Sequence, residues 1–294
     1  MPEIEKKTIP VSMGDGAQSA ITIYSRRPDK SSPVVLYVPA LGVAGEFYEP
    51  FCVAGIEHGW IGATSDLRGN GNSSVRPSRQ TDFGYHEMIA YDLPAYIEAV
   101  KREFPSNPFF ILGHSLGGQL SALYLSMKPE GVTGLILLTS CSVFFCGWNF
   151  PRNIGVLLVT QFFRIAAELF GYFPGRKMGF GGIEARQVMR DWANEALTGR
   201  YRIANSSHDF DTLLGKIETP VLAINFDNDF FAPKKAADYL LRKLGSAPLT
   251  QWYMSENDLG PERAGHFQWA RNPEPLATKI DEWIRDISLR SSVA

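Results

Sequence analysis

Short apolar segments alternate with longer helical segments along this sequence, and this alternation restricts its fold more than any other feature. It is typical of a mostly parallel β-sheet that is covered by helices on both faces. Val34–Val38 is continuously apolar, as expected for a strand that is buried on both sides. The predicted strands are Thr8–Met13, Ala20–Ser25, Val34–Val38, Ile61–Ser65, Phe109–Gly113, Leu135–Thr139, Pro220–Asn225 and Leu249–Met254. The predicted helices are Phe47–His58, Tyr85–Phe104 with a kink at Pro94, Leu116–Met127, Lys234–Leu244 and Pro275–Leu289.

The alternation is interrupted once, after Thr139. Residues 142–208 contain no short apolar strand pattern and instead show helical patterns that are rich in Phe, Trp and Arg. We therefore predict one α/β core formed by residues 1–141 and 209–294, with residues 142–208 inserted as a helical cap. A chain of 294 residues is long enough to bury a substantial core.

The segment Gly113-His114-Ser115-Leu116-Gly117-Gly118 lies where a predicted strand gives way to a predicted helix. A serine on such a sharp turn is held in a strained conformation that lifts its hydroxyl above the sheet. Small residues are needed two positions before and two positions after it, because the backbones approach closely there. Ser115 is therefore the candidate nucleophile. The alternative is a tight structural turn with an inert serine.

A serine hydroxyl needs a base, almost always histidine, to become nucleophilic near neutral pH. Only His266 follows the last predicted strand in a loop that can reach the carboxyl ends of the strands. His58 and His86 lie at helix ends, His208 lies in the insertion, and the side chain of His114 is expected to point away from the Ser115 hydroxyl. A solvated loop histidine is the alternative for His266.

The acid that orients the base should follow a strand and precede the histidine in the sequence. Asp227 and Asp229 both follow the strand that ends at Asn225. We favour Asp229 over Asp227 because Pro233, four residues later, is typical of the start of the next helix. The tetrahedral intermediate needs two backbone N–H donors. These are predicted to be Leu116, next to the nucleophile, and Leu41, in the turn after Val34–Val38.

The insertion is aromatic, and part of it is predicted to line an apolar pocket over Ser115, with Phe144, Trp148 and Phe162 as candidate substrate-binding residues. The alternative is that these side chains pack the cap onto the core. Arginines slightly outnumber acids in the insertion, and a solvated helix face is the favoured interpretation of them.

Nothing in the sequence indicates a nucleic-acid or metal partner. The net charge is −2, and the three cysteines lack the spacing of a metal or redox site. Ile154–Phe173 is interrupted by Arg164 and Glu168, which predicts an amphipathic helix and no stable membrane insertion. The segment Met1–Lys7 lacks the apolar stretch of a secretory signal, so a cytoplasmic location is expected. The oligomeric state is not predicted.

These motifs resemble those of the α/β-hydrolase family over nearly the whole chain, from Val34 to about Leu289. The segment from Asp66 to Ser73 resembles a structural turn of that family. Ser115, Asp229 and His266 match its nucleophile, acid and base in order, and residues 142–208 resemble its cap. One departure is Pro39-Ala40, where many members have His-Gly. The resemblance implies an α/β-hydrolase fold, with a mostly parallel eight-stranded sheet flanked by helices, and the esterase, lipase and serine-peptidase-like subgroup.

The expected function is that of a carboxylesterase-like serine hydrolase. It would cleave an ester of a small or medium apolar acyl group through an acyl-enzyme, and no metal or organic cofactor is needed for this chemistry. An acyltransferase with the same triad and a non-catalytic ligand-binding member of the fold are the alternatives.

Overall fold

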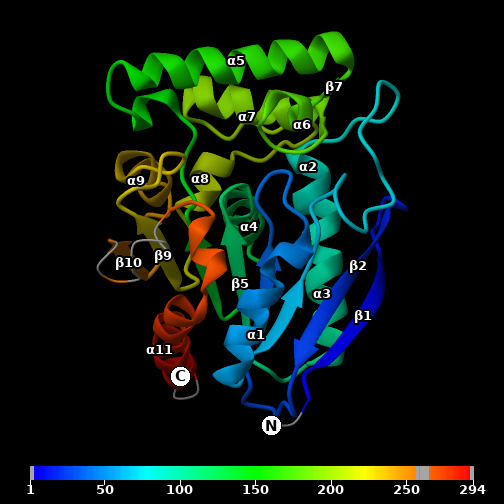
Figure 1. Cartoon of the computed structure of the whole chain (residues 1–294), viewed down its shortest axis with the longest axis vertical. Coiled ribbons are helices and arrows are strands. Elements are labelled where there is room, and N and C mark those ends of the chain that lie inside the picture. The colour runs from blue at the N-terminus through cyan, green and yellow to red at the C-terminus, as the bar shows by residue number, and fades with distance from the viewer. Residues whose placement is uncertain (1–2, 256–257, 259–264, 292–294) are drawn as a thin grey trace.

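The computed structural model describes residues 3–255, 258 and 265–291. Residues 1–2, 256–257, 259–264 and 292–294 of the predicted core therefore lie outside the described residues. An eight-stranded sheet runs through the molecule in the order β1-β2-β4-β3-β5-β6-β9-β10 (Figure 1). β1 and β2 are antiparallel to their neighbours, and the other strands are parallel. The strands are β1 (Glu5–Ser12), β2 (Gln18–Ser25), β3 (Val34–Val38), β4 (Ile61–Thr64), β5 (Phe109–His114), β6 (Gly134–Leu138), β9 (Val221–Phe226) and β10 (Leu249–Met254).

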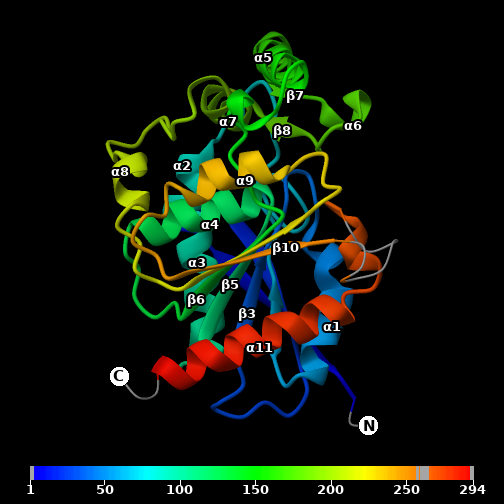
Figure 2. The same ribbon diagram turned by 90° about the vertical axis from the view of Figure 1, so that its left-hand side faces the viewer.

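Helices cover both faces of the sheet, as predicted (Figure 2). Successive residues of β3 point to opposite faces, so Val34 and Leu36 belong to one core cluster and Val35 and Tyr37 to the other. The helices α1 (Glu49–Glu57) and α11 (Glu274–Ser291) pack on the second cluster. The first cluster is covered by α3 (Leu93–Glu103), α4 (Leu116–Ser126), α8 (Phe210–Leu214) and α9 (Lys234–Leu241).

The predicted helix Tyr85–Phe104 is divided in the structure. It consists of α2 (Tyr85–Glu87), a π-helical turn at Met88–Asp92 and α3. Pro94 lies in the first turn of α3, where its missing N–H leaves no helical hydrogen bond unmade. The predicted kink therefore takes the form of a π-turn immediately before the proline. The predicted helix Phe47–His58 likewise begins as a 3₁₀ turn, Gly45–Tyr48, before α1.

The insertion between β6 and β9 lies over the carboxyl ends of the parallel strands (Figure 1). Its helices are α5 (Arg152–Phe170), α6 (Gly175–Met178) and α7 (Arg186–Thr198). It also contains a two-stranded ribbon, β7 (Tyr172–Phe173) and β8 (Glu184–Ala185), whose strands of two residues each are too short to produce a hydrophobic pattern in the sequence. By length and composition alone, α5 is apolar enough to cross a membrane.

A buried carboxyl group ties the cap to the core. Glu195 of α7 accepts hydrogen bonds from the Ser142 hydroxyl at 2.5 Å and from the Val143 N–H at 2.8 Å, both in the segment that follows β6. Burial raises the pKa of Glu195 to about 7 from its usual 4.5. Burial likewise raises the pKa of Glu184 to about 7 and that of Asp191 to about 6.

These raised pKa values predict a cap that loses stability as the pH rises. The folded protein holds the Glu195 proton more tightly than the unfolded chain, so its contribution is fully present below pH 4.5 and is lost as the pH rises through about 7. Glu195→Gln should remove this pH-dependent contribution, which is on the order of 3 kcal/mol. Urea unfolding of both proteins at about pH 5 and about pH 8 measures it. An equal pH dependence in both proteins would contradict the prediction.

Candidate active site

The turn between β5 and α4 holds Ser115 in an unusual backbone conformation. Its φ is 53° and its ψ is −116°, a region that non-glycine residues rarely occupy. A Cβ atom on Gly117 would lie 2.1 Å from the Val38 carbonyl oxygen, and one on Gly113 would lie 2.4 Å from the Cα of Gly118. Both positions therefore need glycine, because the backbones approach closely there, as predicted from the sequence. Such a strained serine is typical of a functional site.

Hydrogen bonds from the neighbouring strand fix this turn. The Ser115 N–H donates to the Leu138 carbonyl at 3.0 Å, at the end of β6. The Ser140 hydroxyl lies 3.0 Å from the Ser115 carbonyl oxygen and 3.2 Å from that of Gly113. A Cβ atom on Gly118 would lie 2.0 Å from the Ser140 hydroxyl oxygen, so this second glycine keeps the space that Ser140 fills.

The structure brings His266 and Asp229 together. Nδ1 of His266 lies 2.8 Å from Oδ2 of Asp229, and both side chains are buried. Oδ1 of Asp229 accepts hydrogen bonds from the N–H groups of Phe231 and Ala232 at 2.8 and 2.9 Å. A carboxylate at Nδ1 places the imidazole proton there and leaves Nε2 as the acceptor. Asp227, by contrast, is exposed, and its N–H donates to the Met254 carbonyl.

A second histidine supports the first. His114 is fully buried, and Nε2 of its ring lies 2.9 Å from the His266 carbonyl oxygen. Its Nδ1 lies 2.8 Å from the hydroxyl of Tyr48, which in turn accepts a hydrogen bond from the Ala40 N–H at 2.9 Å. Burial lowers the pKa of His114 well below its usual value, so the ring is neutral, donating through Nε2 and accepting through Nδ1. This chain of bonds joins the Ala40 turn, the Ser115 turn and the His266 loop. Sequence reasoning excluded His114 as a base but did not find this role.

Ser115 and His266 line one cavity of about 490 Å³ beneath the cap. Leu41 and Leu116, the predicted donors to an oxyanion, line it too. Leu116 begins α4, so its N–H has no acceptor within the helix. The Leu41 N–H makes no backbone hydrogen bond with any residue that the structure describes. The turn is held close to the cap, because a Cβ atom on Gly42 would lie 2.2 Å from the Gly182 nitrogen.

The structure corrects the predicted pocket. Trp148 lines the cavity, but Phe162 is 55% exposed on the outer side of α5, and Phe144 lines a different cavity. The inward positions of α5 follow a spacing of four, three and four residues. They are Val156, Thr160, Phe163 and Ala167. Phe162 and Phe163 are adjacent in the sequence, but they lie on different sides of α5, so Phe162 faces solvent and Phe163 faces the cavity. The aromatic content of the sequence did not distinguish the two.

Other residues of the cavity wall were not predicted. Gln119, one turn into α4, is buried and lines the cavity. Arg152 also lines it, and the Cζ atom of its guanidinium lies 3.6 Å from the centre of the Phe230 ring. The proximity of Gln119 to the Gly117-Gly118 pair was the one sequence signal that could have identified it.

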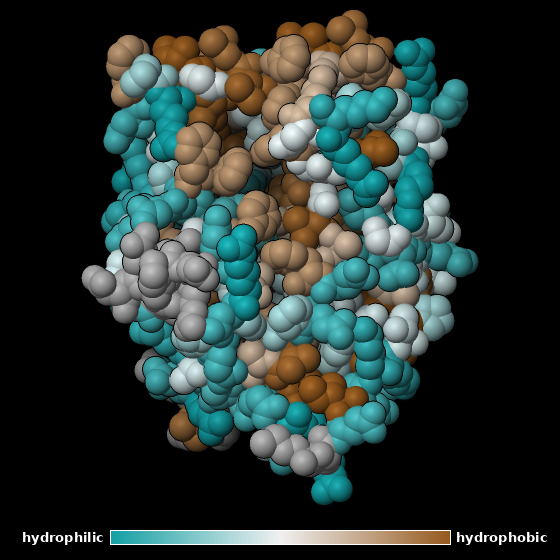
Figure 3. Space-filling model, in the orientation of Figure 1, coloured by the Kyte–Doolittle hydropathy of each residue, from teal (hydrophilic) through white to brown (hydrophobic). Residues whose placement is uncertain are grey.

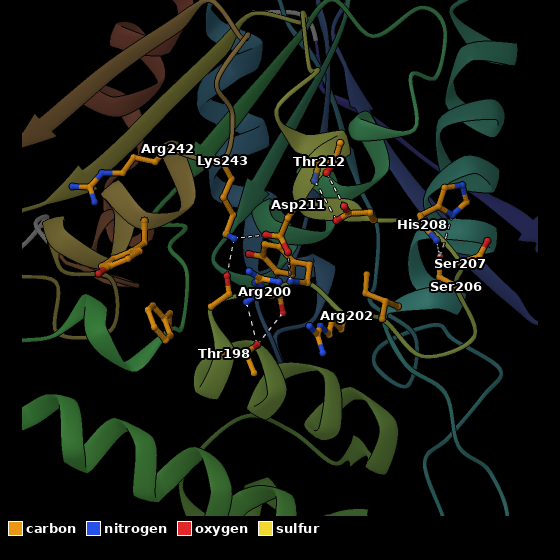
Figure 4. A pocket seen from close by; sticks show the side chains of 16 residues that line it. Thr198, Arg200, Arg202, Ser206, Ser207, His208, Asp211, Thr212, Arg242 and Lys243 are labelled. Atoms are coloured by element: carbon orange, nitrogen blue, oxygen red, sulfur yellow. Dashed lines mark hydrogen bonds and ion pairs between the residues drawn. The ribbon is translucent and has the colours of Figure 1, made fainter.

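A larger and more polar cavity of about 840 Å³ lies nearby, and Phe144 is part of its wall. Figure 4 shows Lys243 reaching toward Asp211 inside it, and the two form an ion pair. The Tyr201 hydroxyl, from this wall, donates to Oε1 of Gln119 at 3.1 Å. Ser115 and His266 do not line this cavity, so its size does not make it the reaction site.

Comparisons with known proteins agree with this architecture. The family model described as alpha/beta hydrolase fold matches residues 33–180. Monoglyceride lipases of Rattus norvegicus and Mus musculus are 32% and 28% identical to the chain over 74 residues, which is 25% of this chain and 23% of each relative. The match thus spans about a quarter of the length of these curated relatives.

Solved esterase structures share the fold. An esterase of Pyrococcus furiosus superposes with a TM-score of 0.62 at 13% identity, covering 96% of this chain and 91% of that one. An esterase of Exiguobacterium antarcticum gives a TM-score of 0.60 at 16% identity, with 97% and 100% covered. At these identities the likeness shows the fold alone.

Proposed function

Because this chain belongs to the alpha/beta hydrolase fold family, we propose that it is a serine esterase that acts through Ser115, His266 and Asp229. The observation that carries the proposal is the 2.8 Å contact between His266 and Asp229, with His266 facing the same cavity as Ser115. Ser115 contributes the strained turn that exposes a nucleophile. The names of the esterases and monoglyceride lipases that the chain resembles support the same class of reaction.

The proposed reaction is acyl transfer to water. Oγ of Ser115 attacks the ester carbonyl while Nε2 of His266 accepts its proton and then returns it to the leaving alcohol. Asp229 holds the imidazole in the required tautomer. The N–H groups of Leu41 and Leu116 donate to the oxyanion. Water, deprotonated by His266, then releases the acid and restores Ser115.

The cavity wall favours an apolar acyl group. Beyond the reacting residues, the side chains of the wall are mostly aliphatic and aromatic, among them Trp148, Val159 and Phe163. A volume of about 490 Å³ suits a small or medium acyl chain.

An ester panel with a matched pair of variants tests this proposal. Val159 and Leu158 are neighbours on α5, and only Val159 lines the cavity. Val159→Phe should lower kcat/KM for the longest soluble esters about tenfold or more, because the larger ring shortens the acyl site, while short esters are spared. Leu158→Phe should leave the profile unchanged. Equal effects of both variants, or hydrolysis of no ester by folded wild-type protein, would contradict the proposal.

A further inference from the structure

The outer side of α5 carries an apolar stripe that faces solvent. Its members recur every three or four residues, which places them on one face of the helix. They are Ile154, Leu158, Phe162, Ile165 and Leu169, and between 46% and 72% of each side chain is exposed. Figure 3 shows hydrophobic side chains gathered along the upper end of the molecule, where Figure 1 places α5. Soluble proteins rarely leave so regular an apolar surface uncovered, so this face marks an interaction site.

The exposed apolar surface continues into the cavity of Ser115. Val159, Phe230 and Phe231 are each about half exposed and also line that cavity. The mouth of the cavity therefore opens among exposed apolar side chains. An acyl chain could pass from a hydrocarbon environment outside to the nucleophile along these apolar side chains.

Positively charged side chains lie on α5 itself and on α6 of the same cap. Arg164 of α5 and the neighbouring Arg176 and Lys177 of α6 are exposed, and they form no ion pair with any carboxylate in the part of the chain that the structure describes. The one exposed acid of α5, Glu168, is neutralised by Arg190 of α7. The surface beside the stripe is thus cationic, and it is complementary to an anionic lipid headgroup layer.

We propose that α5 docks the protein on an anionic membrane surface, with its apolar stripe in the headgroup boundary and Arg164, Arg176 and Lys177 among the headgroups. α5 lies in the membrane plane and does not span it, because its inward face packs on α7 and lines the cavity. In this orientation the cavity mouth meets the lipid, so the substrate class is an ester with an aliphatic tail drawn from the membrane. The substrate class rests on the esterase function proposed above, whereas the docking does not.

A lipid surface fits this face better than a second copy of the chain. A partner copy on the stripe would cover Val159 and the cavity mouth, and it would bring a second set of unpaired cations against the first. A membrane satisfies both features at once, because it is apolar within and anionic at its surface.

Vesicle flotation of the Ser115→Ala chain tests docking without turnover. Flotation with phosphatidylcholine vesicles that contain phosphatidylserine is expected, and it should weaken in high salt and with pure phosphatidylcholine. Leu169→Glu should lower binding about tenfold or more, because it places a charge in the stripe. Leu249→Glu is the control, since Leu249 is an exposed leucine on β10, outside the cap, and it should bind normally. Arg176→Gln with Lys177→Gln should lower binding to the anionic vesicles about tenfold.

Three results would overturn docking. They are no flotation of folded protein, equal flotation of Leu169→Glu and its control, and a dimer in sedimentation that Leu169→Glu dissociates. In parallel, hydrolysis of a soluble short ester is measured with protein that keeps Ser115. If the folded Ser115→Ala protein does not float while the protein that keeps Ser115 hydrolyses the ester, the docking surface alone is refuted. Flotation without hydrolysis of any ester refutes the proposed function alone.

Discussion

Ser115→Ala is expected to lower ester turnover by about 10⁴–10⁶-fold while the protein remains folded. The loss should appear in kcat with little change in KM, because the hydroxyl forms the acyl bond but contributes little to the apolar wall that binds the substrate. The cavity, the oxyanion donors and the His266–Asp229 pair stay in place, so a small residual rate above that in water should survive. Steady-state kinetics on a soluble ester measures both parameters.

A covalent probe separates a lost nucleophile from a damaged fold. A fluorophosphonate should label the wild-type protein at Ser115 and leave Ser115→Ala unlabelled. Ser126 is the control position, because it is a buried serine of α4 whose hydroxyl bonds the Leu123 carbonyl, away from the cavity. Ser126→Ala should retain labelling. Wild-type protein that resists the probe while it unfolds cooperatively would instead favour a non-catalytic binding role.

Local patterns in the sequence identified the strands and the turn that holds Ser115, although β1 begins at Glu5 and not at the predicted Thr8. β3 and β10 have the predicted bounds. β3 is a continuous apolar run, and β10 begins directly after Pro248, so both can be recognised in the sequence. The glycines at positions 113 and 117 were predicted from the close approach of backbones, which the distances to Gly118 and Val38 explain. Such features depend on neighbours along the chain, which is why one sequence reveals them.

Features that depend on contacts between distant segments could not be predicted from local sequence patterns. The choice between Phe162 and Phe163 depends on how α5 rotates against α7, and no local pattern fixes that rotation. The bond from His114 to the His266 carbonyl joins residues 152 positions apart. Only the fold brings them together, so the sequence excluded His114 as the base without revealing its contact with the His266 loop.

Asp229→Asn is expected to lower kcat about 10⁴-fold, whereas Asp227→Asn should stay within a few-fold of wild type. The hydrogen bonds of Asp229 give the reason. Its Oδ1 accepts from the N–H groups of Phe231 and Ala232, so the oxygen of an asparagine must take that place and its NH₂ group must face His266. That amide donates to Nδ1, which forces the imidazole proton onto Nε2. The base then holds a proton on the nitrogen that should accept one from Ser115.

The two aspartate variants are matched in chemistry, and they differ in burial and in contact with His266. Because the amide oxygen in Asp229→Asn would keep both backbone hydrogen bonds, thermal unfolding of that variant should move little, and the defect should lie in catalysis. Fluorophosphonate labelling should slow in parallel with turnover, since both need the Ser115 proton to leave. A crippled Asp227→Asn beside an active Asp229→Asn would transfer the acid role to Asp227 and require the His266 loop to rearrange in the working enzyme.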